Sequence, residues 1–231
     1  MTVSFPEFGS GLGLPGDANV QAALALPKRG GPYRRLFKRA FDIAAILAAA
    51  PVIVPVVAAL AFAIARDGGR PFYSQMRVGK GGKRFRMWKL RSMVCDADAR
   101  MEDYLSAHPE ARLEWDLTQK LKSDPRITRM GKILRQSSLD ELPQLWNVLR
   151  GDMSLVGPRP IMVSQQVIYP GVAYYALLPG CTGYWQTAGR NRTTFEARAQ
   201  YDTAYEETLS FAKDMKILLG TVSVMLKGTG Y

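Results

Sequence analysis

Two adjacent carboxylates in the middle of the chain could carry out phosphate chemistry. Asp140 and Glu141 lie within residues 137–144, and Pro143 is best tolerated in the first turn of a helix, so both carboxylates are expected near a helix N-terminus. Free N–H groups there attract phosphate, and a carboxylate in that place can bind Mg²⁺ or attack phosphorus. The alternative is structural, because Ser138-x-x-Glu141 also has the form of a helix capping box.

The cations that phosphate chemistry requires lie in short motifs on both sides of the carboxylates. Arg159 is framed by Pro158 and Pro160, which fix the backbone and favour a set direction for its guanidinium. A guanidinium held in this way suits a bidentate contact with phosphate. Scattered basic residues more often form a solvated surface, and this is the alternative for the others, which are Lys89, Arg91, Arg126, Arg129 and Arg135.

The positive charge of the chain is concentrated in one window. The 231 residues carry a formal net charge of +11, and the stretch from Lys28 to Arg91 holds 15 Lys and Arg against Asp42 and Asp67. Such a window implies an anionic partner, which could be nucleic acid, a phosphorylated substrate or the anionic face of a bilayer.

The soft metal ligands of the chain are few. One histidine, His108, and two cysteines without paired spacing, Cys95 and Cys181, are too few for a zinc site. We therefore expect both thiols to be reduced and structural.

An apolar run at residues 43–65 contains 23 residues and no charged or hydrogen-bonding side chain. This length matches a bilayer, and the run starts too far into the chain for a signal peptide. Pro51 and Pro55 each remove a helical hydrogen bond near its middle, which predicts a sharp bend.

Basic residues lie on both flanks of this run, and they favour the cytoplasmic side for both of its ends. We therefore expect a re-entrant helix-break-helix whose charged heads lie among anionic lipid phosphates. An ordinary tilted span with kinks is the alternative. The flanking residues are Arg34, Arg35, Lys38 and Arg39 before the run, and Arg66, Arg70, Arg77 and Lys80 after it.

The whole pattern predicts an α+β fold that is mainly helical. Residues 1–32 are rich in Gly and Pro and indicate a mostly disordered lead-in, residues 33–69 hold the membrane helix, and residues 70–231 form a cytoplasmic catalytic domain. Within that domain, residues 71–78 and 83–90 flank a glycine cluster and predict a small β-hairpin.

Helices are expected in three further places. A polar helical stretch runs from residue 96 to about residue 121, and a second helical element begins at residues 130–135. Residues 205–226 have the pattern of an amphipathic helix, which could lie on the membrane surface or pack on the protein core.

From about residue 38 to its end, the chain contains eight motifs in the order in which they occur in the bacterial sugar transferase family. Through these motifs the chain resembles that family. This family comprises polyprenyl-phosphate hexose-1-phosphate transferases, and the chain is most similar to its short members that start exopolysaccharide synthesis with galactose or glucose 1-phosphate. The motifs are Lys38-Arg39-x-Phe41-Asp42, the apolar run with Pro51, Phe72-x-x-Gln75-x-Arg77-x-Gly79, Lys89-Leu90-Arg91-Ser92-Met93, Asp124-Pro125-Arg126-Ile127-Thr128, Ser138-Leu139-Asp140-Glu141-Leu142-Pro143-Gln144, Leu155-Val156-Gly157-Pro158-Arg159-Pro160 and Pro179-Gly180-Cys181-Thr182-Gly183-Tyr184-Trp185-Gln186.

The resemblance implies a role for each site residue. Asp140 would attack the β-phosphorus of a UDP-sugar, release UMP and carry a sugar phosphate covalently, and Glu141 would hold Mg²⁺ across the diphosphate. Undecaprenyl phosphate would then accept the sugar phosphate. The residues that would position the phosphates are Lys89, Arg91, Arg126, Arg135 and Arg159.

The resemblance also implies a re-entrant monotopic anchor at the cytoplasmic face of the bacterial inner membrane, among its lipids, and leaves homo-oligomers open. The same reaction with an N-acetylated amino sugar remains an alternative. A membrane-tethered nucleic-acid-binding protein is the alternative from another class, because aromatic residues interleave with the basic window. Nucleic-acid binding does not explain why Asp140 and Glu141 occur with a proline-framed arginine, so we expect no nucleic-acid partner.

Overall fold

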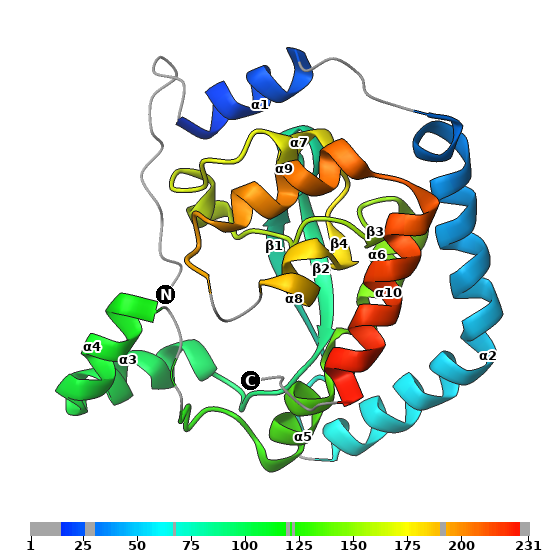
Figure 1. Ribbon diagram of the computed structural model, residues 1–231. Coiled ribbons are helices and arrows are strands. Elements are labelled where there is room, and N and C mark those ends of the chain that lie inside the picture. The colour runs from blue at the N-terminus through cyan, green and yellow to red at the C-terminus, as the bar shows by residue number, and fades with distance from the viewer. Residues whose placement is uncertain are drawn as a thin grey trace.

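The computed structural model describes residues 15–25, 31–66, 68–118, 121, 123–189 and 193–226. Within these residues, helices surround two short two-stranded sheets, and a long apolar helix arches around one side of the molecule (Figure 1). The predicted α+β fold with mainly helical content is confirmed.

The predicted hairpin is present as strands β1 (Phe72–Val78) and β2 (Arg84–Leu90), which pair antiparallel. A short turn, η2 (Lys80–Gly82), joins them. Gly81 and Gly82 have φ angles of 63° and 75°, a left-handed region that glycine adopts without a steric penalty. The glycine cluster therefore supplies the tight reversal between the strands.

One face of this hairpin carries basic residues toward the interior. Arg77 lies opposite Phe85, and Lys89 lies two residues beyond Met87 on the same strand. Opposed residues share a face, and so do alternate residues along a strand. Phe85 and Met87 are buried, so Arg77 and Lys89 project on the side of the hairpin that packs against the domain.

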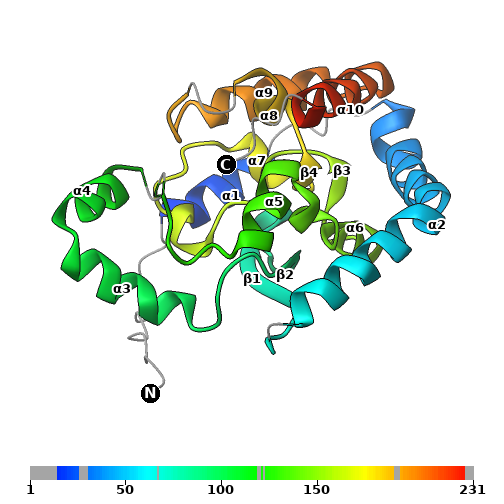
Figure 2. The same ribbon diagram turned by 90° about the horizontal axis from the view of Figure 1, so that it is seen from below.

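The apolar run forms one long helix, with a π-helical turn η1 (Tyr33–Phe37) followed by α2 (Lys38–Ala65). The predicted break is absent, because helical structure continues through Pro51 and Pro55. The helix instead changes direction along its length (Figures 1 and 2). Each proline lacks the N–H that would bond one carbonyl a turn earlier, and the loss of these bonds permits the bend while the remaining bonds keep the helix continuous.

α2 packs on the rest of the protein near both of its ends. Near its start, Asp42 is buried and accepts hydrogen bonds from the Ser154 hydroxyl at 2.7 Å and the Leu155 N–H at 3.3 Å. Near its end, Ile64 is buried in a cluster with Leu90. The two ends of the helix therefore belong to one packed unit.

The middle of α2 presents apolar side chains outward. Val52 is 69% exposed, Val54 is 63% exposed and Val56 is 37% exposed. Within the described residues this is the one helix long and apolar enough to cross a membrane, by length and composition. A continuous apolar surface of this kind is typical of contact with a membrane or a partner rather than with water.

A buried carboxylate joins the start of the apolar helix to the C-terminal part of the chain. Asp214 accepts hydrogen bonds from the hydroxyls of Tyr33 at 2.8 Å and Tyr205 at 2.6 Å, and it pairs with Lys38 Nζ at 2.6 Å. Lys38 was expected among lipid phosphates. The protein engages it instead, because a carboxylate 1% exposed requires a cation nearby.

Two segments predicted as single helices are each divided. Residues 97–118 of the predicted stretch form α3 (Ala97–Ala107) and α4 (Pro109–Thr118), because Pro109 is tolerated at the start of a helix but not inside one. The C-terminal segment forms α9 (Arg198–Thr208) and α10 (Phe211–Leu226), separated at Leu209, whose ψ of 115° is not helical.

α10 packs on the core through one face and exposes another. Ile217 lies in a buried cluster with Val156 and Tyr205, whereas Leu219 and Val222 are exposed. The sequence left core packing and membrane contact as alternatives. The structure shows core packing on one face, and the exposed apolar face stays available for a membrane surface.

Part of the predicted disordered lead-in is helical. Residues 15–25 form α1 (Pro15–Ala25), in which Ala23 is buried in a cluster with Tyr169, and Asn19 Nδ2 donates to the Tyr169 carbonyl at 3.1 Å. Val20 and Ala23 have the spacing of one helix face, and burying that face stabilises the helix. Residues 1–14 and 26–30 of the lead-in lie outside the described residues.

The remaining elements surround the two adjacent carboxylates or support the loops next to them. The predicted helix at residues 130–135 is confirmed as part of α5. Strands β3 and β4 pair in parallel. These elements are α5 (Arg129–Ser137), η3 (Leu139–Glu141), α6 (Gln144–Arg150), β3 (Ser154–Val156), η4 (Val163–Gln166), α7 (Ala173–Ala176), β4 (Gly180–Thr182) and α8 (Tyr184–Ala188).

Candidate active site

Asp140 and Glu141 lie in the tight turn η3, between the end of α5 and the start of α6. Ser138 ends α5 in the left-handed region, with φ 58° and ψ 18°, and its side chain makes no capping hydrogen bond within the described structure. The capping-box interpretation is therefore wrong, because this backbone closes one helix rather than opening the next. The Glu141 N–H donates to the Ser138 carbonyl at 3.2 Å instead.

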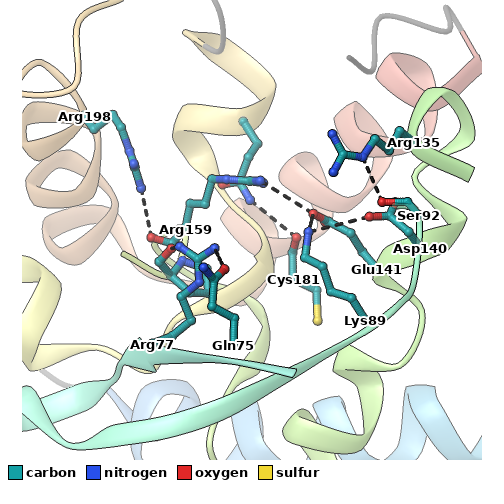
Figure 3. Close-up of polar contacts among 12 residues, drawn as sticks. Gln75, Arg77, Lys89, Ser92, Arg135, Asp140, Glu141, Arg159, Cys181 and Arg198 are labelled. Atoms are coloured by element: carbon teal, nitrogen blue, oxygen red, sulfur yellow. Dashed lines mark hydrogen bonds and ion pairs between the residues drawn. The ribbon is translucent and has the colours of Figure 1, made fainter. Parts of the chain in front are cut away.

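Lys89 lies between the two carboxylates (Figure 3). Its Nζ is 2.7 Å from Glu141 Oε1 and 3.7 Å from Asp140 Oδ2. Asp140 is 7% exposed, and Glu141 is partly buried. The structure thus brings Lys89, which was expected to position phosphates, to the two carboxylates, and its position follows from the face of β2 that it occupies.

Arg159 approaches the same Glu141 oxygen that Lys89 contacts. Its Nη2 is 3.6 Å from Glu141 Oε1, and its side chain is 41% exposed (Figure 3). The loop that carries it begins at Gly157, where an added Cβ would lie 2.3 Å from the Leu178 carbonyl oxygen. Only glycine permits this close approach of two backbones, which brings the loop beside β4.

Arg135 and Ser92 form the edge of the site beside Asp140. Arg135 Nε donates to the Ser92 hydroxyl at 2.9 Å, and the positive charge of Arg135 acts on Asp140 (Figure 3). Arg135 lies in the last turn of α5, which brings its charge close to the turn that holds the carboxylates. A cation here could contact a phosphate bound at Asp140.

Two residues predicted to bind phosphate are engaged elsewhere. Arg91 donates to the Ile64 carbonyl at 3.2 Å in the last turn of α2, and this carbonyl also accepts from the Arg66 N–H. Arg126 is buried and forms a bidentate pair with Asp124, with N–O distances of 2.9 and 2.7 Å. These contacts hold Arg91 at the end of α2 and Arg126 beside Asp124, and their phosphate-binding role stays a prediction.

The two carboxylates have opposite electrostatic environments. Burial would raise the pKa of Glu141, but Lys89 and Arg159 outweigh it and lower that pKa to about 2. Burial raises the pKa of Asp140 above its ordinary value, Lys89 opposes this, and the negative charge of Glu141 adds to the rise. Adjacent carboxyl groups whose pKa values are pushed apart are typical of residues with different chemical roles. Glu141 is the carboxyl group that stays ionised to lower pH, and Asp140 is the more basic one.

The carboxylate pair suits a divalent cation that is shared with a substrate. Mg²⁺ in phosphate-processing sites is held by one or two carboxylates together with substrate phosphates. Within the described residues no group of three or more His, Cys, Asp or Glu could hold a metal ion by itself. The Lys89 ammonium already lies within 3.7 Å of both carboxylates, so they can share one cation.

Three residues of the site region were not among the predicted site residues. Arg77 donates to Gln75 Oε1 at 2.6 Å, and its positive charge acts on Glu141. Arg198 donates to the Arg159 carbonyl at 2.9 Å. Gln75 and Arg77 occur in a motif of the family resemblance, which was the available signal. Arg198 lies in the C-terminal segment, where no pattern marked it.

The chain is similar to curated bacterial proteins. It is 46% identical over 198 residues to the UDP-galactose-lipid carrier transferase of Erwinia amylovora, covering 85% of this chain but 42% of that protein. It is 37% identical over 221 residues to the exopolysaccharide production protein ExoY of Sinorhizobium fredii, covering 92% of this chain and 96% of that protein. It is 36% identical over 227 residues to the UDP-glucose:undecaprenyl-phosphate glucose-1-phosphate transferase of Caulobacter vibrioides, covering 92% and 79%.

The family model for bacterial sugar transferases matches residues 33–228, which include the apolar helix, the hairpin and every residue of the site. The match therefore covers the elements that bring Lys89, Arg159 and the two carboxylates together. The chain belongs to the bacterial sugar transferase family.

Proposed function

We propose that this chain transfers hexose 1-phosphate, from UDP-galactose or UDP-glucose, to undecaprenyl phosphate and releases UMP. The observation that carries the proposal is the contact between Lys89 and the Asp140–Glu141 pair, with Arg159 3.6 Å from Glu141. A diphosphate needs such cations, and the more basic Asp140 carboxylate suits nucleophilic attack. The names of the relatives from Erwinia amylovora and Caulobacter vibrioides support these donors, and the latter name supports the acceptor.

The reaction proceeds in two displacements at one phosphorus atom. An oxygen of Asp140 attacks the β-phosphorus, the bond from that phosphorus to the bridging oxygen breaks, and UMP leaves with the electron pair. A phosphate oxygen of the lipid carrier then attacks the same phosphorus and displaces Asp140 as a free carboxylate. The product is the hexose diphosphate lipid, and the enzyme returns to its starting state.

The cations of the site stabilise charge during both steps. Lys89 and Arg159 both lie beside Glu141 Oε1, where they can stabilise the negative charge that develops on the phosphate oxygens. Glu141, with Asp140 beside it, would hold Mg²⁺, which neutralises charge on the diphosphate when bound. Lys89 would then exchange part of its contact with the carboxylates for contact with phosphate.

The contacts of α2 support a re-entrant anchor at the cytoplasmic face of the inner membrane. A straight helix of its 28 residues would be about 42 Å long, enough to cross a bilayer. Both ends of α2 pack on the same catalytic unit, so both ends lie on one side of the membrane, while the exposed middle enters the hydrocarbon. Undecaprenyl phosphate would reach Asp140 along that surface, in the first membrane step of exopolysaccharide synthesis.

The proposed reaction is tested with purified protein, Mg²⁺, undecaprenyl phosphate and a panel of UDP-sugars. UMP release should require a UDP-hexose, and lipid product should carry both the hexose and its phosphate. A control without Mg²⁺ should show little release. UMP release with UDP-N-acetylhexosamines but not with UDP-galactose or UDP-glucose would overturn the assigned donors.

The re-entrant topology predicts one-sided labelling. Single cysteines at Gly31 and Lys80, which flank the apolar helix and are exposed, would be introduced after replacing Cys95 and Cys181. A membrane-impermeant thiol reagent should label neither site in intact spheroplasts and both sites after lysis. A spanning helix would expose one of the two to the outside, so labelling of either site before lysis would contradict the re-entrant arrangement.

A further inference from the structure

The backbone that carries Arg159 is held at three consecutive carbonyl groups. The Pro158 carbonyl accepts a hydrogen bond from the Gly180 N–H at 2.8 Å, and the Arg159 carbonyl accepts one from Arg198 at 2.9 Å. The Pro160 carbonyl accepts a longer hydrogen bond from Arg77 at 3.4 Å. Side chains from β1 and α9, far apart in the sequence, thus meet on the proline-framed segment (Figure 3).

Arg198 is placed where a charge is costly. It is 7% exposed, and its guanidinium carbon lies 4.7 Å from the centre of the Trp185 ring and 5.1 Å from that of Phe195. Asp202, one helical turn later, offsets part of its charge and in turn accepts a hydrogen bond from the Tyr169 hydroxyl. An apolar side chain of similar volume would often pack in such a place at less cost.

The hydrogen bond from the buried Arg198 guanidinium to the Arg159 carbonyl indicates a role for this charge. In the described part of the chain, the Arg159 carbonyl is the hydrogen-bond acceptor of Arg198. The Arg159 side chain is long and 41% exposed, so its direction depends on how its backbone is fixed. A backbone held by Arg198 and restricted by Pro158 and Pro160 reduces the number of directions in which the guanidinium can point.

The cations that surround this segment repel one another. Burial and the charge of Arg159 lower the pKa of Arg77 to about 10. Burial also lowers the pKa of Arg198; Asp202 opposes this, and the charge of Arg159 adds a smaller lowering. Grouping three guanidinium groups is unfavourable in the free protein and becomes favourable when an anion binds beside them. The arrangement therefore fits a site that is completed by phosphate.

We propose that Arg198 is a positioning residue, which acts through the Arg159 backbone to direct the Arg159 guanidinium at Glu141 and the phosphates bound there. This inference rests on the proposed transfer reaction. Arg198 itself touches no reacting atom, so its effect should depend entirely on the presence of the Arg159 guanidinium. A small displacement of a charge-stabilising group can reduce the rate of a reaction by about 100-fold.

A double-mutant cycle on the full chain tests this dependence. The variants are Arg198→Met, Arg159→Met and the two combined, with kcat and KM measured for UDP-hexose by UMP release, and with thermal stability measured for each. Arg198→Met should lower kcat by about 10- to 100-fold with a smaller change in KM. The combined variant should be no slower than Arg159→Met alone. Arg112→Met, on α4 and 47% exposed, is the matched control and should retain wild-type kinetics.

Arg198→Lys keeps a cation beside the Trp185 and Phe195 rings. It therefore allows the role of Arg198 to be tested even if Arg198→Met fails to fold. It should keep most of the thermal stability and recover part of kcat through one donated hydrogen bond. Losses that multiply in the combined variant, or a folded Arg198→Met with wild-type kcat, would show that Arg198 is only a packing residue. Wild-type protein that releases no UMP would instead overturn the transfer reaction and this inference with it.

Discussion

Asp140→Asn should reduce turnover by at least about 10⁴-fold and leave the thermal stability close to that of the wild-type chain. The loss follows because an amide oxygen is a poor nucleophile and cannot carry the sugar phosphate. Folding should persist, because Asn keeps the size of Asp, burial already disfavours the charged form of Asp140, and Lys89 keeps its 2.7 Å contact with Glu141. Steady-state UMP release and a thermal melt measure the two effects.

The covalent step gives this prediction a second readout. Wild-type protein with UDP-hexose but no lipid should release up to one UMP per active site and gain the mass of a hexose phosphate. Asp140→Asn should do neither, whereas Asp103→Asn, an exposed position on α3, should behave as wild type. Parallel double-reciprocal lines are expected for this route. Intersecting lines without a trapped adduct would remove Asp140 from the nucleophile role and leave the transferase proposal in place.

The rate of the first step should also depend on pH through Asp140. The attacking group must be ionised, so activity should fall as pH decreases through the pKa of Asp140, which lies above its ordinary value. Glu141, with a pKa of about 2, stays ionised throughout this range and contributes no acid limb.

Glu141→Gln should reduce activity by about 10²- to 10³-fold at limiting Mg²⁺, and added Mg²⁺ should restore part of it. The amide keeps one oxygen ligand but loses the negative charge that attracts a hard cation. Titration of UMP release against Mg²⁺ measures the shift. Glu102→Gln, at a side chain that is 70% exposed, is the matched control and should leave the Mg²⁺ dependence unchanged. An unchanged Mg²⁺ dependence in Glu141→Gln would rule out the metal-binding role.

The same substitution should destabilise the fold in a pH-dependent way. The pKa of Glu141 is depressed from 4.5 to about 2 by Lys89 and Arg159, so its ionised form stabilises the folded state above pH 4.5 by up to about 3 kcal/mol. This contribution is lost as pH falls toward 2. Denaturant unfolding of wild type and Glu141→Gln should therefore differ most near neutral pH and converge in acid. A difference that persists undiminished at pH 2 would contradict the electrostatic origin of the effect.

Local patterns in the sequence determined the elements and the chemical candidates. Glycines between two short apolar-aromatic segments predicted the hairpin, because a tight reversal needs left-handed residues at Gly81 and Gly82. The 23-residue apolar run predicted a membrane helix broken at its prolines, and the structure has the helix without the break. The proline-framed Arg159 and the Asp140–Glu141 pair predicted the candidate site residues. Each of these sequence signals lies within a few residues of the structural element or side chain that it predicted. The division at Leu209 and the helical part of the lead-in were missed, since they depend on a single backbone angle and on packing. The division at Pro109 was missed although proline is a local signal against a helix interior.

The tertiary structure alone decided which cations reach the carboxylates. Lys89 meets Glu141 across 52 positions in the chain, whereas Arg91, two residues later, is used to cap α2. Sequence spacing does not distinguish Lys89 from Arg91 as a partner of the carboxylates, because alternate residues share one face of a strand. The two residues differ because β2 ends between them. Arg198 reached the site through the packing of α9 on the Arg159 loop, which no local pattern encodes. Long-range packing decides which group each of these basic side chains contacts. A long basic side chain can donate only to acceptors that the fold brings within about 3 Å of its nitrogen atoms.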